Sequence, residues 1–214
     1  MTARLPARLE PAPDAPALLA AAEAEERTAE GLYIRDIDLS GTRLFGLRLR
    51  GVLFENCRLS GCCWQRADCV DVVFRHCDLS NSDWRDGYFE RTAFESCKAV
   101  GAAFPETGWR DAIWQGSAMG YASFDRASLR ETAFADCDLS SAILADCAWK
   151  RLAFANCRME NVSFLHTALG GLDLTSCNIG GLTVSESSVE LRGAIVSPEQ
   201  AVGLAKRLGV VVKE

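Results

Sequence analysis

The feature that most constrains this chain is a step of five residues that runs without a break through most of its length. Counting forward by five from Leu39 to Val189 gives 31 positions, and every one of them is apolar. No insertion or deletion shifts the frame between these two residues. A fixed period sustained over so many units predicts one repeat architecture and not several globular domains.

A second column of residues lies two positions before the first and is small or apolar at most levels. The residue between the two columns is mostly polar or charged, as at Asp38 and Arg43. Alternation of inward and outward side chains is typical of a β-strand. The other two residues of each unit must then turn the chain, so each unit forms one side of a coil.

A period of 20 residues lies on top of the five and indicates that each coil has four sides. Large apolar residues recur in one ladder, and cysteines recur in another. The ladders are Phe54, Phe74, Phe94, Trp114, Phe134, Phe154 and Leu174, and Cys57, Cys77, Cys97, Cys137, Cys157 and Cys177. We predict an all-β, four-sided β-helix of about eight coils, with these residues in its core and no internal ligand cavity.

One corner of the coil also repeats every 20 residues. It carries Gly41, Gly61 and Asn81, which tolerate a positive φ and indicate a type II turn. Tyr121 and Ser141 occupy the same corner, and we expect a different turn at these two levels.

The two ends of the chain lie outside the frame. Residues 1–31 predict a tail with a capping helix over 15–30 that ends at Gly31, and a mobile tail is the alternative. Residues 32–190 form the repeat. In residues 191–214, Ser197 and Gln200 predict a capping box that starts a helix, Gly209 ends it, and 210–212 read as a short strand.

Segments such as Cys77-Asp78-Leu79-Ser80-Asn81 resemble the pentapeptide repeat, written A(D/N)LXX, and the resemblance covers about residues 37–190. It implies a right-handed quadrilateral β-helix, and the handedness follows from the resemblance alone. The C-terminal stretch is similar to that of the quinolone-resistance pentapeptide proteins, and the absence of loops in the frame fits their mycobacterial type better than the plasmid-borne one. This likeness implies a C-terminal cap and an end-to-end homodimer, with a plain hydrophobic cap as the alternative. The expected interface is Val202, Leu204, Ala205, Leu208, Val210, Val211 and Val212.

Composition and motifs argue against catalysis and against a metal or cofactor. His76 and His166 are too far apart in the frame to form one site, and no phosphate-binding loop is present. The ten cysteines fall mostly in inward columns, where cysteine packs as a small hydrophobe. A linear ladder of thiols does not provide the four converging ligands of a zinc site. We therefore expect a protein that is not an enzyme.

Charge and hydropathy limit which partners and which cellular location we expect for the chain. A net charge of −6 and a pI near 5.1 disfavour direct binding to nucleic acid. No apolar run of transmembrane length is present, and the N-terminal segment is a poor match to a signal peptide. These features predict a cytoplasmic protein.

The resemblance also implies a function. The segment from Asp78 to Asp146 holds 12 acidic and six basic residues, so the middle of the chain is acidic. An acidic rod could occupy the DNA-binding groove of DNA gyrase or another type II topoisomerase as a mimic of DNA. The outward residues proposed for this contact are Asp78, Asp83, Asp86, Asp136 and Asp138. Ordinary solubility charge on a scaffolding solenoid with an unknown protein partner is the alternative.

Overall fold

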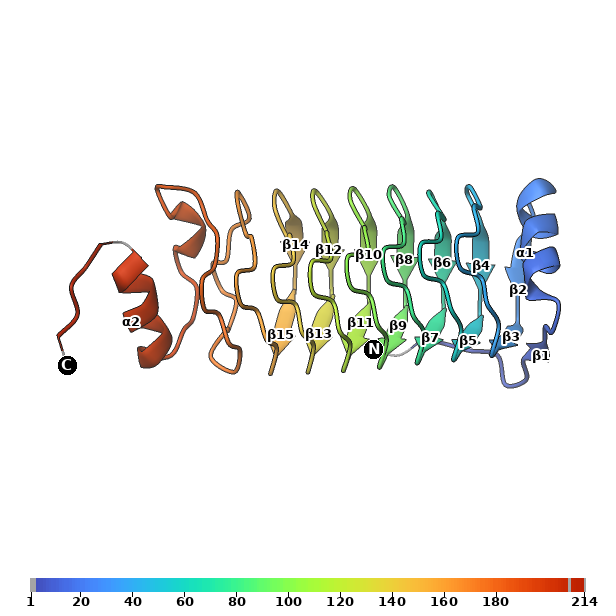
Figure 1. Cartoon of the computed structure of the whole chain (residues 1–214), viewed down its shortest axis with the longest axis horizontal. Helices are drawn as coiled ribbons and strands as arrows, with labels where there is room; N and C mark the ends of the chain where they lie inside the picture. Colours follow the sequence, from blue (N-terminus) through green and yellow to red (C-terminus); the bar gives the residue numbers. More distant parts are fainter. Residues whose placement is uncertain (1–2, 208, 214) are drawn as a thin grey trace.

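The structure, a computed structural model, describes residues 3–207 and 209–213 and is a rod of stacked coils (Figure 1). Two of its four walls are parallel sheets. The eight-stranded sheet contains β1 (Glu10–Pro11), β3 (Leu32–Arg35), β5 (Leu53–Glu55), β7 (Val73–Arg75), β9 (Ala93–Glu95), β11 (Ile113–Gln115), β13 (Ala133–Ala135) and β15 (Ala153–Ala155). The seven-stranded sheet contains β2 (Thr28–Glu30), β4 (Arg48–Arg50), β6 (Asp68–Val70), β8 (Tyr88–Glu90), β10 (Gly108–Arg110), β12 (Ser128–Arg130) and β14 (Ala148–Lys150).

Paired residues on neighbouring strands of these sheets are 20 positions apart, as the 20-residue period predicts. Phe54 lies opposite Phe74, and Phe74 lies opposite Phe94 on the next strand. The other two walls pair through single parallel bridges, such as Asp38 with Arg58. The predicted all-β, four-sided β-helix is confirmed. Regular strands make about seven turns, because beyond β15 the pairing is reduced to single bridges.

Aromatic rings fill the interior in continuous stacks. The ring of Phe94 lies between those of Phe74 and Trp114, at centroid distances of 4.8 and 3.8 Å. Such contacts add about 0.5–1.5 kcal/mol per pair beyond the burial of apolar area. Every residue of the two predicted ladders is at most 6 % exposed: Phe54, Phe74, Phe94, Trp114, Phe134, Phe154, Leu174, Cys57, Cys77, Cys97, Cys137, Cys157 and Cys177.

Hydroxyl residues in the small inward column bond the tryptophan side chains. The Trp84 indole N–H donates to Ser82 Oγ at 2.7 Å, and Ser82 Oγ donates to the Leu79 carbonyl at 2.6 Å. Thr107 Oγ1 accepts a hydrogen bond from the indole N–H of Trp109 at 2.8 Å in the same way. Because an unpaired buried donor is costly, these polar residues serve the packing of the tryptophans and do not mark a site.

The expectation of a different turn at Tyr121 and Ser141 is wrong. Both residues adopt a φ of 60°, in the same left-handed region as Gly101 at 67°. Their backbone N–H groups bond the carbonyls of Ser140 and Glu160 on the next coil, at 3.0 and 2.8 Å. The ladder therefore imposes the corner conformation, at a cost of about 1–2 kcal/mol for a residue other than glycine.

The N-terminal end of the rod is covered by α1 (Ala15–Ala24) (Figure 1). Its buried face consists of Ala15, Leu19 and Ala22, which join the core of the solenoid. The expected helix over 15–30 is wrong in its second half. The chain turns at Glu26, with φ of 50°, and β2 pairs with β4 because the first coil needs a partner for its ladder groups.

Residues 3–9, here named the N-terminal arm, run back along one edge of the rod (Figure 1). They pass the corners between β4 and β5 and between β6 and β7. The backbone N–H of Arg4 donates to Asp71 Oδ1 at 2.9 Å. The ring of Pro6 lies against Gly51, where an added Cβ would come within 2.8 Å of the proline Cδ. Gly51 is therefore small because the arm passes over it.

The C-terminal end combines η1 (Val189–Leu191), a 3₁₀ turn not predicted from the sequence, with α2 (Pro198–Arg207). The capping box is present: Ser197 Oγ accepts the Gln200 N–H at 3.2 Å, and Gln200 Oε1 accepts the Ser197 N–H at 2.8 Å. The expected strand over 210–212 is wrong. In the described chain those residues form no strand, and the Val210 N–H donates back to the Ala205 carbonyl of α2 at 3.1 Å.

Candidate interaction surface

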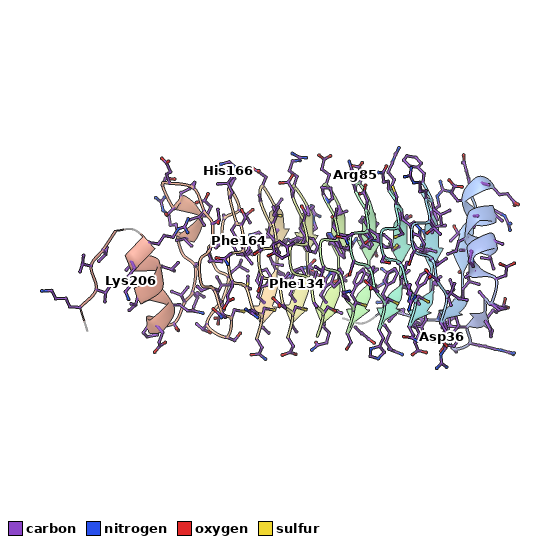
Figure 2. All side chains as sticks on the ribbon, in the orientation of Figure 1. Asp36, Arg85, Phe134, Phe164, His166 and Lys206 are labelled. Carbon is purple, nitrogen blue, oxygen red and sulfur yellow. The ribbon has the colours of Figure 1, made fainter. Side chains whose placement is uncertain are left out.

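The outer surface of the rod is mostly polar and convex, and most of the aromatic residues lie inside, whereas Phe45, Tyr88 and Tyr121 are exposed. Figure 2 shows Asp36, Arg85 and His166 projecting outward and Phe134 and Phe164 within the rod. Among the described residues no group of three or more His, Cys, Asp or Glu side chains could hold a metal ion. Neither α1 nor α2, the α-helices of the described chain, has the length and apolarity of a membrane span. The charged side chains and the two ends of the rod are the main features of this surface.

The five acidic residues proposed for partner binding do not lie together. Asp78 and Asp138 share one column but are three coils apart, with Lys98 and Ala118 at the levels between them. Asp136 follows the end of β13, whereas Asp83 and Asp86 lie on different parts of the coil from Asp78. The structure thus distributes these carboxylates over several sides of the rod.

Most of these carboxylates are already engaged by neighbouring groups. Burial would raise the pKa of Asp78, but hydrogen bonds from Ser80 and the Lys98 ammonium at 3.6 Å lower it below its usual value. The pKa of Asp83 is lowered likewise: burial opposes the shift, and hydrogen bonds from Arg85 and Gln65 outweigh it.

The other three carboxylates differ in their surroundings. Asp136 accepts from the side-chain amides of Gln115 and Asn156, at 2.6 and 3.2 Å. Asp138 accepts from the backbone and hydroxyl of Ser140, at 3.0 and 2.6 Å. Asp86 is exposed.

Charges on successive coils alternate in sign along two columns. Arg75 Nε lies 2.7 Å from Glu95 on one side, and its Nη1 lies 3.5 Å from Glu55 on the other. In the other column Asp38, Arg58, Asp78 and Lys98 follow one another through parallel bridges. Opposite charges on neighbouring strands stabilise a sheet. The acidic excess of the middle of the chain therefore does not form an unbroken acidic stripe along these columns.

The residues expected at a dimer interface gather at the C-terminal end, beyond the last coil. Leu204 and Ala205 are half-buried, while Val202 is 38 %, Val210 52 %, Val211 84 % and Val212 36 % exposed. Leu208 lies outside the described residues. Gln200 anchors α2 by donating to the carbonyls of Leu174 and Cys177, at 2.8 and 2.6 Å. A hollow of about 380 Å³ remains between α2 and the last coil.

One charged feature was missed from the sequence. The last residues of β10, β12 and β14 are Arg110, Arg130 and Lys150, which lie in register on neighbouring strands. With Arg151 at the next position they form what is here named the basic edge. All four are exposed. Counting forward by 20 residues from Arg110 identifies this row of cations in the sequence. A sum of charges over a continuous segment does not identify it.

Comparison with known proteins agrees with this architecture. Residues 67–142 and 87–163 match the family model described as "Pentapeptide repeat region". The chain is a pentapeptide repeat protein. Its period of five residues is thus that of a known repeat family.

This pentapeptide repeat protein is similar to a quinolone resistance pentapeptide repeat protein, QnrB96 of Scandinavium goeteborgense. The two are 31 % identical over 104 residues, which span 44 % of this chain and 47 % of the relative. The match therefore spans about half the length of that relative.

Solved structures that resemble the pentapeptide repeat protein include a trypsin-treated variant of QnrB1, a plasmid-mediated fluoroquinolone resistance protein. That comparison has a TM-score of 0.45 and 22 % identity over 88 % of this chain and 92 % of the other. A second is HetL of the cyanobacterium Nostoc, a pentapeptide repeat protein involved in heterocyst differentiation regulation. Its TM-score is 0.33, with 14 % identity over 73 % of this chain and 84 % of the other.

Proposed function

We propose that this pentapeptide repeat protein is a non-catalytic, cytoplasmic binding protein whose partner is a type II topoisomerase such as DNA gyrase. It modulates that enzyme or protects it from quinolone inhibitors. The single observation that carries the proposal is the 31 % identity to a quinolone resistance pentapeptide repeat protein over 104 residues. A convex rod with a filled core also suits a protein that acts by contact and not by chemistry.

The charge pattern limits how such binding could work. A net charge of −6 steers the rod toward the basic groove that receives DNA. Alternating columns hold many carboxylates in ion pairs, so imitation of DNA rests on the overall field and on the more exposed Asp86 and Asp136. The other acidic candidates, Asp78, Asp83 and Asp138, are half-buried and engaged locally.

The same pattern favours a second candidate function. A rod whose surface charges neutralise one another between coils needs no DNA-binding partner, and this suits a structural scaffold for an unknown protein. The C-terminal apolar residues would join two rods in either case. A homodimer through this end remains part of the proposal.

Supercoiling by DNA gyrase, measured with and without a fluoroquinolone, tests the topoisomerase proposal. The protein at micromolar concentration is expected to inhibit supercoiling or to restore it in the presence of drug. The variant Asp86→Lys/Asp136→Lys should weaken the effect, because it reverses the two most exposed candidate carboxylates. A matched control, Glu23→Lys/Glu25→Lys at the C-terminal end of α1, changes the charge equally but far from the middle of the rod.

The outcomes separate the two candidates. If neither supercoiling nor drug inhibition changes at any concentration up to tens of micromolar, the scaffold function stands and the topoisomerase proposal is lost. If the wild type is active and both double variants weaken it equally, only the net charge of the rod acts, and the assignment to Asp86 and Asp136 is wrong.

A further inference from the structure

The basic edge departs from the charge pattern of the rest of the rod. Arg110, Arg130 and Lys150 follow one another on neighbouring strands, which are about 4.8 Å apart. Like charges placed directly opposite one another destabilise a sheet. Elsewhere the register avoids this, since Arg75 lies between Glu55 and Glu95. A bound anion would offset the repulsion along the basic edge.

The cations of this edge are only partly neutralised by the chain itself. Within residues 3–207 and 209–213, neither Arg130 nor Lys150 has a carboxylate oxygen within 4.0 Å. Arg110 reaches Asp111 only at 4.0 Å, and Arg151 pairs with Glu131. A hollow of about 190 Å³ is lined by Arg110, Arg130, Glu131, Lys150 and Arg151. The edge thus offers an open site with a net positive charge.

The same edge already carries the N-terminal arm nearer the N-terminal end of the rod. The N-terminal arm places Pro6 against Gly51 and the Arg4 N–H on Asp71. Gly51 and Asp71 are 20 residues apart, which is one coil, whereas Pro6 and Arg4 are two residues apart. The arm therefore advances one coil, about 4.8 Å, for every two of its residues, which is less than the roughly 6.4–6.8 Å that two fully extended residues would span.

The occupied part of the edge and the basic edge are continuous. Positions 51, 71, 91, 111, 131 and 151 form one corner column, and each stands next to the end of a strand of the seven-stranded sheet. The arm carries Arg4 and meets the carboxylate of Asp71, so chain and edge are complementary in charge. On the basic edge Arg110, Arg130, Lys150 and Arg151 outnumber Asp111 and Glu131, so the complementary chain there is acidic.

We propose that the basic edge binds an acidic segment of a partner protein that runs along it as the N-terminal arm does, with a carboxylate at every second residue. In a segment of the form Glu-x-Glu-x-Glu, successive carboxylates would face Arg110, Arg130 and Lys150, because two residues span one coil. A long polyanion such as DNA fits less well, since the edge covers three strands and the rod as a whole carries a charge of −6. This inference does not depend on a topoisomerase partner.

Titration of the isotope-labelled protein with short peptides, followed by NMR at low ionic strength, tests the proposal. The probe is Gly-Glu-Gly-Glu-Gly-Glu-Gly, and the matched peptide Gly-Gly-Glu-Glu-Glu-Gly-Gly has the same composition and charge. The alternating peptide is expected to bind more tightly and to shift the Nε–H signals of Arg110, Arg130 and Arg151. The indole N–H signal of Trp149 should also shift, because its side chain lines the surface beside Arg130 and Lys150.

Variants of the full chain locate the contact. Arg130→Glu/Lys150→Glu should weaken binding about tenfold, since two exposed pairs are lost and replaced by repulsion. Arg58→Glu/Arg158→Glu is the matched control, because these arginines are also exposed and lie in another column. If the glutamate variant unfolds, Arg130→Gln/Lys150→Gln replaces it, with at least threefold weaker binding expected.

Three results would overturn the proposal. In the first, the two peptides bind equally well, which removes the register of two residues per coil. In the second, the control variant loses as much affinity as the basic-edge variant. In the third, a single-stranded oligonucleotide of 12 nucleotides binds this edge more tightly than the alternating peptide, which assigns the edge to nucleic acid.

Discussion

The carboxylate of Glu190 accepts the backbone N–H of His166 at 3.0 Å, in the place where a carbonyl of the next coil would otherwise stand. One and two coils earlier, the equivalent N–H groups of Asp146 and Arg126 donate to the carbonyls of Leu165 and Ala145. Glu190 also accepts from the backbone and hydroxyl of Ser185, at 3.1 and 2.8 Å, and is 2 % exposed. The Glu190 side chain therefore caps the hydrogen-bond ladder between coils at the level where no further coil supplies a carbonyl.

Glu190→Gln should destabilise the C-terminal coils. A hydrogen bond to a charged group contributes about 1.5–3 kcal/mol, and glutamine can keep only part of the set. We expect a lower urea midpoint in unfolding followed by tryptophan fluorescence. Glu186→Gln, at an exposed position four residues earlier, is the control and should unfold like the wild type. Equal midpoints for all three proteins would show that Glu190 is not a cap.

The contribution of Glu190 should depend on pH. Burial would raise its pKa, but hydrogen bonds from its own backbone, Ser185 and His166 outweigh burial and lower the pKa to about 2. The unfolded value is near 4.3, so the stabilisation is complete above that pH and is lost as the pH falls toward 2. The difference in Tm between wild type and Glu190→Gln should therefore shrink on acidification. A difference that stays constant from pH 7 to pH 2.5 would contradict this assignment.

Truncation of the stacked ring at Phe94 should weaken the whole rod. Its neighbours Phe74 and Trp114 contact both of its faces, and the side chain is fully buried. Phe94→Ala should cost about 3–5 kcal/mol in the free energy of unfolding, and Phe94→Asp should prevent folding. Tyr121→Ala is the control, because its ring is 69 % exposed. Circular dichroism melts measure both effects, and a wild-type melt for Phe94→Asp would refute the inward assignment.

Thiol reactivity should single out Cys63. The other nine cysteines are buried, and burial raises the pKa of the Cys147 thiol to about 12. A raised pKa keeps a thiol protonated and unreactive. Titration of the native protein with a disulfide reagent should modify about one thiol rapidly, and Cys63→Ser should abolish that fast phase. Rapid modification of several thiols in native Cys63→Ser would mean that the cysteine ladders open readily.

The proposed homodimer should depend on the apolar C-terminal end. Val202→Asp/Val211→Asp places charges on two exposed residues of that end and should halve the mass measured by light scattering. Deletion of residues 197–214 should have the same effect. Leu18→Asp, on an exposed position of α1 at the opposite end, is the control. A wild-type protein that is monomeric at all concentrations would refute the dimer and leave α2 as a plain cap.

The repeat made the core predictable, because burial at Phe94 or Cys97 follows from position in the frame alone. The ends were less accessible. Nothing periodic marks Glu190 as a cap. Gly51 is a corner residue with a positive φ, so its glycine gives no sign in the sequence that Pro6 packs over it. The proposed acidic surface shows a different limit. Asp78 and Asp138 both contribute to the acidic excess counted along the sequence. The register places them three coils apart, however, with Lys98 and Ala118 at the levels between them.

The 20-residue register also sets how far along the chain a residue must search for its partner. In both sheets most pairings join residues 20 positions apart, which is about a tenth of the 214-residue chain. Low relative contact order is associated with fast folding, so this all-β rod should assemble more like a helical protein, coil upon coil. The N-terminal arm is different, since Arg4 meets Asp71 across 67 residues. The arm can dock only after the first three coils have formed, so its docking should be a late step in folding.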